Sequence, residues 1–209
     1  MNHLAHSLLS YPDGENLLGN FIGDFVKGSA WQAYPPDIRA GILLHRRIDA
    51  FTDAHPAVRA SVHRIRPVAG RYAGPVADVL YDHLLLRHWS EYTELSFEDY
   101  AAWLYAALDE RQARMPEPLQ QRWPLMRQAR FVHGYADAPG MLRVLERFSR
   151  RLAGHFDPTA VHAAFFGEIE AFSADFSAFF PDLRAYLAAN PHKSDFFPAD
   201  PAADQSGRV

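Results

Sequence analysis

The chain has 209 residues, of which 48% are hydrophobic and 13% aromatic, so it is long enough to bury one sizeable core. It contains no cysteine, which excludes disulfide bonds and thiolate metal ligands and leaves histidine and carboxylate as the strong ligand types. The net charge of −4, from 21 basic and 25 acidic residues, gives no sign of binding to nucleic acid or to an anionic membrane. The first residues lack the basic segment of a signal peptide and no apolar run approaches membrane-spanning length, so we expect a cytoplasmic protein.

Apolar residues recur with the 3.6-residue period of a helix in almost every segment, and no segment shows sustained two-residue alternation. We therefore predict an all-α fold, a single compact multi-helix domain over residues 1–190. Residues 191–209 are rich in Pro, Asp, Ser and Ala and are predicted to form a flexible tail. In chain order, helices are predicted within 15–28 (ending at Gly28), 35–56 (starting at a Pro pair), 57–74 (broken at Pro67 and Gly70), 75–92 (opening at Pro75), 96–115 (with Ser96 and Asp99 resembling a capping box), 118–135, 138–156 and 157–191.

The segment GILLHRRIDAFTDAHP places two polar residues inside the apolar stripe of its helix. At about 100° per residue, His45 and Asp49 fall on the same side as Ile38 and Ile42. Removing a carboxylate from water without a partner costs several kcal/mol. Asp49 therefore needs a cation, a metal ion or strong hydrogen-bond donors nearby.

The same argument applies to two other segments. In DVLYDHLLLRHW, Asp78 and Asp82 share an apolar face and His83 lies about 100° round from Asp82. In the first long helix, Asp24 is a further inward-facing carboxylate, and His6 adds an imidazole just before that helix. Taken singly, such a residue is more often hydrogen-bonded to a helix end or paired with an arginine than bound to metal.

Taken together, these residues favour a divalent-cation site, because three helices present carboxylate or imidazole to one core. Mixed His and Asp ligands suit Mn²⁺, Fe²⁺ or Mg²⁺ and, less selectively, Zn²⁺. In an all-α protein such a site indicates attack of activated water on an electrophile, usually phosphorus. Lys27, Arg46 and Arg47 stand beside the ligands and could hold a phosphate, although they could equally belong to the solvated surface.

The quoted motifs resemble a known family. MNHLAH, LLGNFIGDFVKG, PPDIRAGILLHRRIDAFTDAHP and DVLYDHLLLRHW are similar to segments of the acyl carrier protein phosphodiesterases, all-α proteins related to the HD-domain phosphohydrolases. The resemblance is strongest over residues 1–89 and continues more weakly to about residue 190. It implies an HD-domain-like fold and a Mn²⁺-dependent hydrolase. Its reaction would cleave the phosphodiester between 4'-phosphopantetheine and the serine of holo-acyl carrier protein.

The resemblance also implies roles for individual residues. Asp24 matches a family active-site aspartate, and His6 matches the N-terminal histidine. The metal and catalytic set is matched by His45, Asp49, Asp82 and His83, although the adjacent Asp-His order is the reverse of an ordinary HD pair. A serine alkoxide needs a proton to leave, and His83 or His6 is the candidate general acid. Asp24 could bind the metal or orient the attacking water.

An acidic carrier protein would have to meet a local basic surface, because this chain is itself net negative. The first candidate is the segment RASVHRIRPVAGR, which has no acidic neighbour and carries Arg59, Arg64, Arg66 and Arg71. The second candidate is RVLERFSRR, which carries Arg143, Arg147, Arg150 and Arg151. Either could simply be a solvated basic face.

Two other functions stay open at this point. One keeps the metal site but acts on a nucleotide or another small phosphoester, which a small closed pocket would favour. The other is a non-catalytic module that binds acyl carrier protein, with its inward acids paired to arginine. That module would bind no metal, and retaining four buried carboxylates without a cation would be costly.

Overall fold

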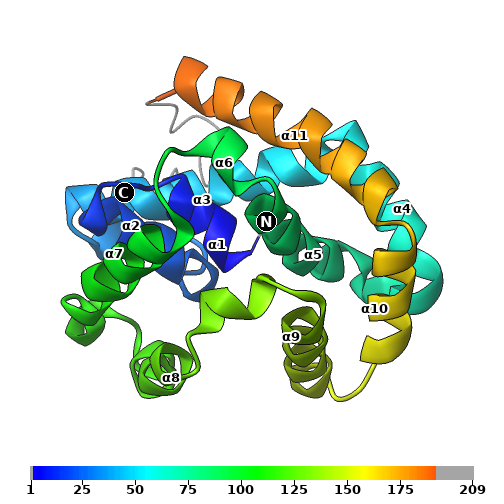
Figure 1. The fold of residues 1–209 in the computed structure, drawn as a ribbon. Coiled ribbons are helices and arrows are strands. Elements are labelled where there is room, and N and C mark those ends of the chain that lie inside the picture. Colours follow the sequence, from blue (N-terminus) through cyan, green and yellow to red (C-terminus); the bar gives the residue numbers. More distant parts are fainter. Residues whose placement is uncertain (1, 192–209) are drawn as a thin grey trace, which may run out of the picture.

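The computed structural model describes residues 2–191, and this part of the chain is helical throughout, with no β-strand (Figure 1). The all-α prediction is therefore confirmed. Short 3-10 turns, labelled η, join several of the helices. The elements are α1 (His3–Leu8), α2 (Gly14–Ile22), η1 (Gly23–Phe25), η2 (Ala30–Ala33), α3 (Pro36–Ala54), α4 (Pro56–Ala69), η3 (Gly70–Tyr72), α5 (Ala73–Arg87), α6 (Trp89–Tyr92), α7 (Phe97–Asp109), η4 (Gln112–Arg114), α8 (Glu117–Gln128), η5 (Phe131–Tyr135), α9 (Ala138–Arg151), α10 (Pro158–Gly167) and α11 (Ile169–Ala189).

Most helix boundaries follow from local chemistry. The side chain of Ser96 accepts a hydrogen bond from the backbone N–H of Asp99, which confirms the predicted cap of α7. Several predicted boundaries are wrong, and the segments predicted over 75–92, 96–115 and 118–135 each divide into a helix and a further short turn or helix. The helix from residue 15 ends at Ile22 and is followed by η1, α4 continues through Pro67, and residues 157–191 form two helices. Pro67 is tolerated because it lies in the last turn of α4, where few helical hydrogen bonds follow it.

The helices pack around one apolar core. Helix α1 contacts both α2 and α5, α3 lies against α2, and α4 packs on α5 and α11. In Figure 1, α11 runs along one side of the molecule, while α8 and α9 lie on the opposite side. Four phenylalanines of α11 are fully buried, as are Trp123 of α8 and Tyr81 of α5. The amino-terminal helix that carries His6 is thereby held in the interior.

Two glycines bring the backbones of α2 and α3 into direct contact. A Cβ atom on Gly19 would lie 2.0 Å from the carbonyl oxygen of Ile38, and one on Gly41 would lie 2.1 Å from that of Asn16. Any larger residue at these positions would force the helices apart. This close crossing fixes the position of His45 on α3 relative to Asn20 on α2 along the two helix axes.

No helix in residues 2–191 is long and apolar enough to cross a membrane. The predicted flexible tail, apart from Pro191, lies outside the described residues.

Candidate metal centre

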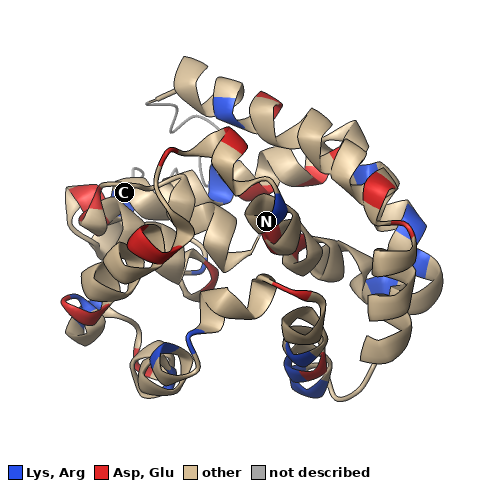
Figure 2. Ribbon diagram, viewed as in Figure 1, with Lys and Arg blue, Asp and Glu red and all other residues tan. Residues whose placement is uncertain are grey.

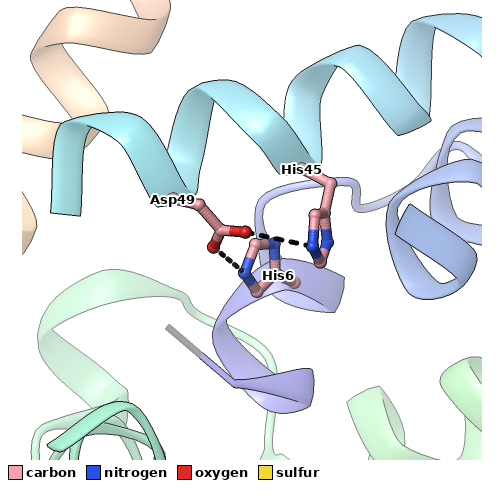
Figure 3. Close-up of side chains that lie close together, drawn as sticks. All are labelled: His6, His45 and Asp49. Carbon is pink, nitrogen blue, oxygen red and sulfur yellow. Dashed lines mark hydrogen bonds and ion pairs between the residues drawn. The ribbon is translucent and has the colours of Figure 1, made fainter. Parts of the chain in front are cut away.

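Three of the predicted site residues converge on one point. His6 comes from α1, whereas His45 and Asp49 project from successive turns of α3 (Figure 3). Nε2 of His6 lies 3.1 Å from one carboxylate oxygen of Asp49, and Nε2 of His45 lies 3.1 Å from the other. All three ligand atoms lie within 4.8 Å of one another. This donor set of two imidazoles and a carboxylate fits a divalent cation.

Asn20 of α2 orients both imidazole rings. Its side-chain oxygen lies 2.8 Å from Nδ1 of His6, and its backbone oxygen lies 2.8 Å from Nδ1 of His45. The amide nitrogen of Asn20 donates to the backbone oxygen of His6 and to Ser10, which assigns the amide oxygen as the acceptor. Each Nδ1 therefore carries the proton, so that each Nε2 can present its lone pair to a metal ion. The sequence analysis missed this role of Asn20.

Gly23 makes room for the ring of His45. A Cβ atom on Gly23 would lie 2.3 Å from Cγ of His45, well inside van der Waals contact. Gly23 begins the turn η1 that carries Asp24. The glycine thus lets this turn lie directly against His45.

Asp24 lies at the edge of this group. One of its carboxylate oxygens is 3.5 Å from Nε2 of His45, and its side chain is 70% exposed. The side chain of Asp49 is also 42% exposed. Both carboxylates line a cavity rather than the core, so the prediction that they lie in the core is wrong: Asp24 is exposed and Asp49 is half-buried. Because they keep contact with water, they are available to a substrate.

Opposite charges on His45 and on the two neighbouring carboxylates stabilise one another and shift the pKa of each group. Burial opposes the charged form of His45, but hydrogen bonds to Asp24 and Asp49 raise its pKa to about 9. The hydrogen bond from His45 lowers the pKa of Asp24 to about 2. Burial would raise the pKa of Asp49, but its close contacts with His45 and His6 hold that pKa below its usual range. A bound cation would take the place of the His45 proton.

The group opens into a cavity of about 540 Å³, which we call the cluster cavity. Two further acids line it; Asp78 is one of the inward-facing acids of the sequence analysis, whereas Asp53 was missed. Asp53 lies one turn beyond Asp49 on α3, and Asp78 projects from α5. Burial and the nearby Asp78 raise the pKa of Asp53. Their one-turn spacing from Asp49 and Asp82 was the available signal. Arg122 of α8 and Arg151 of α9 also line the cluster cavity.

Asp82 and His83 do not join this group, and the prediction that they bind the metal needs correction. Both carboxylate oxygens of Asp82 accept backbone N–H groups of α1, from Leu4 at 2.9 Å and Ala5 at 3.1 Å. Nδ1 of His83 lies 2.7 Å from the carbonyl oxygen of Tyr135, and its ring packs edge-on against Phe165. Asp82 caps the helix that carries His6, while His83 belongs to the packing between α5 and its neighbours.

The predicted phosphate-binding residues do not line the cluster cavity. Arg46 donates to the carbonyl oxygens of Val26 and Gly28, which anchors the segment after η1. Arg47 is buried and donates to the carbonyl oxygen of Asn190. Lys27 is exposed. Their positive charges flank the site in sequence but do not line the cavity.

None of the arginines of the first candidate docking surface lines the cluster cavity. Arg64 is engaged by Asp175 and Glu168, and Arg59 donates to the carbonyl oxygen of Asp53. Arg66 and Arg71 are exposed on α4 and η3. The second candidate lies closer, because its residue Arg151 lines the cavity. Basic residues gather along α9 in Figure 2.

Comparison with known proteins gives the family. The sequence profile of the family described as acyl carrier protein phosphodiesterase matches residues 1–183. The acyl carrier protein phosphodiesterase of Photorhabdus laumondii is 31% identical over 94% of this chain and 98% of its own length. That of Enterobacter sp. (strain 638) is 45% identical over 44% of this chain, a match that spans about half of that relative, 47%. No solved structure matches, so the HD-domain likeness stays a prediction. The chain belongs to the acyl carrier protein phosphodiesterase family.

Proposed function

We propose that this protein hydrolyses the phosphodiester that joins 4'-phosphopantetheine to the serine of holo-acyl carrier protein. The main support for this proposal is the group of His6, His45 and Asp49, which opens into a cavity in a chain of this family. Both relatives are named acyl carrier protein phosphodiesterase, which gives the same substrate class. The carrier protein as partner, and the cytoplasm as location, belong to this proposal.

The three-residue group is the proposed metal site. His6, His45 and Asp49 would hold a divalent cation, with Asp24 beside them as a further ligand or as the group that orients water. Mn²⁺ is the proposed ion, and Mg²⁺ and Fe²⁺ suit the same ligands. Such an ion supplies Lewis-acid chemistry, because it offsets charge on a phosphate and lowers the pKa of water.

The reaction balances as a simple hydrolysis. The oxygen of water bonds to phosphorus, the bond from phosphorus to the serine oxygen breaks, and the serine oxygen takes up a proton. The products are the apo carrier protein and 4'-phosphopantetheine. Asp24, exposed beside His45, is placed to accept a hydrogen bond from the attacking water. His83 does not line the cavity, so we assign the proton donor to Asp53, which does and whose pKa is raised.

The test is mass spectrometry of purified holo-acyl carrier protein incubated with this protein and Mn²⁺. We expect the carrier protein to lose the mass of 4'-phosphopantetheine with the wild type and with Glu94→Ala, an exposed acid that does not line the cavity. We expect no loss with Asp24→Ala. An unchanged mass with Mn²⁺ bound would reject this substrate and favour a small phosphoester. An unchanged mass with no Mn²⁺ bound would favour the non-catalytic module.

A further inference from the structure

A second cavity adjoins the cluster cavity. It has a volume of about 400 Å³ and lies between α5, α8, η5 and α9. Its wall is mainly apolar, and we call it the apolar cavity. The two cavities lie side by side, and His45 and Asp49 line only the cluster cavity. They share seven lining residues: Asn2, His3, Val79, Arg122, Met126, Phe148 and Arg151. The wall of the apolar cavity is completed by Leu125, Phe131, Tyr135 and Val144.

One residue of this wall extends the apolar surface of the cavity out to the solvent. The side chain of Leu125 is 69% exposed, more than any other large hydrophobic residue in the described part of the chain. In the described residues, the other exposed large hydrophobic residue is Tyr11, at 40%, and its ring packs edge-to-face against Trp103. An exposed leucine at the rim of an apolar cavity is typical of a surface that binds an apolar ligand.

Two arginines stand where the cavities join. Within residues 2–191, neither Arg122 nor Arg151 has an ion pair with a carboxylate. The guanidinium carbon of Arg151 lies over the ring of Phe148, 5.2 Å from its centroid. The neighbouring arginines differ, since Arg127 pairs with Asp109 at 3.1 Å and Arg130 with Glu98 at 2.7 Å. Guanidinium groups without a carboxylate partner are suited to a phosphate.

The polar groups of the apolar cavity are few and uncharged apart from arginine. Nδ2 of Asn2 donates to the hydroxyl of Tyr135 at 2.9 Å, and both residues line the cavity. The ligand that fits this space has a phosphate at one end and then a chain of methylene groups interrupted by neutral amides. A small number of hydroxyl and amide groups in an apolar pocket gives such a chain its orientation.

We propose that the apolar cavity binds the pantetheine arm of the carrier protein, with the phosphate held at the junction by Arg122 and Arg151. This inference rests on the proposed function. It fixes the direction of the substrate, since the arm points away from the metal-binding group and the serine of the carrier protein stays at the cavity mouth. Arg122, Arg151 and Leu125 then take the place of Lys27, Arg46 and Arg47 as the substrate-binding residues.

The test compares Leu125→Glu with wild type in two measurements with Mn²⁺ present. The first is the KM and kcat for holo-acyl carrier protein, and the second is the inhibition constant of free pantetheine, which lacks both phosphate and protein. Because Leu125 is exposed, the substitution should not disturb folding. We expect both KM and the inhibition constant to rise at least tenfold while kcat changes less than threefold.

Two matched variants accompany this test. Leu125→Met keeps the apolar wall and should leave both constants near those of wild type. Arg127→Gln lies on the same helix, lines neither cavity and should behave likewise. A raised KM with an unchanged inhibition constant would place Leu125 against the carrier protein and overturn the inference, as would two unchanged constants. Failure of the wild type to cleave holo-acyl carrier protein would instead overturn the proposed function, and this inference with it.

Discussion

The backbone oxygen of Asn20 accepts a hydrogen bond from Nδ1 of His45 at 2.8 Å, and the side-chain oxygen of the same residue does so for His6. One residue of α2 thus sets the ring orientation of the two histidines, on two other helices, that we propose as metal ligands. Removing a residue that orients a metal ligand without touching the metal typically weakens metal binding by roughly 10-fold to 100-fold.

Asn20→Ala should therefore weaken Mn²⁺ binding by about one to two orders of magnitude, because the ring of His6 loses its orienting acceptor. Titration calorimetry of the folded variant measures this, with folding checked by circular dichroism. The matched control is Asn16→Ala, one turn earlier on α2, where the side-chain oxygen has no hydrogen-bond partner. Equal Mn²⁺ affinity in the two variants would refute the orienting role of Asn20.

Gly23→Ala should displace the ring of His45, because the added Cβ atom would lie 2.3 Å from its Cγ. The backbone at Gly23 has φ −51° and ψ −40°, which alanine adopts readily, so the steric contact is the main cost. We expect a loss of about 1–3 kcal/mol in the free energy of unfolding and at least tenfold weaker Mn²⁺ binding. Gly167→Ala meets no atom within 4 Å and serves as the control. A Gly23→Ala variant with wild-type Mn²⁺ affinity would show that His45 does not bind the ion.

Asp82→Ala should lower stability rather than remove a ligand. The substitution leaves the buried N–H groups of Leu4 and Ala5 without their acceptor, which costs about 2–4 kcal/mol in the free energy of unfolding. Urea denaturation measures this loss. Asp24→Ala, at an exposed position, should show the reverse pattern, with little change in stability and no cleavage. If Asp82→Ala unfolded like wild type but failed to bind Mn²⁺, Asp82 would be a ligand after all.

His3 should make the protein sensitive to mild acid. Its ring packs against Phe21 at 5.1 Å and Phe131 at 5.8 Å, and burial lowers its pKa from 6.5 to about 4. The unfolded chain therefore binds a proton at a pH where the folded protein does not. The contribution of His3 to stability is full above about pH 6.5 and is lost as the pH drops towards 4, by at most about 1.4 kcal/mol per pH unit.

The measurement is urea denaturation with chelator at several values between pH 7 and pH 4. His3→Gln should reduce the slope of unfolding free energy against pH in that window. It should not abolish the slope, because burial also lowers the pKa of His6 and of His83. The same slope in His3→Gln and wild type would count against this assignment.

The sequence by itself determined the helical fold and the core of the metal centre. The 3.6-residue period predicts the helices, and the four-residue spacing of His45 and Asp49 places them on one face of α3 wherever that helix packs. The motifs around His6 and Asp24 indicate the family from the sequence alone. These features depend on local geometry, which a sequence encodes directly.

Only the tertiary structure decided what lies across from each face. Asp78 and Asp82 share a face of α5, yet Asp78 lines the cluster cavity while Asp82 caps α1. Arg46 and Arg47 stand next to His45 in sequence but bind distant carbonyl groups, whereas Arg122 and Arg151 reach the cavity from remote helices. Helical periodicity gives the angle of a side chain about its own axis, but the identity of its neighbour depends on how the helices pack.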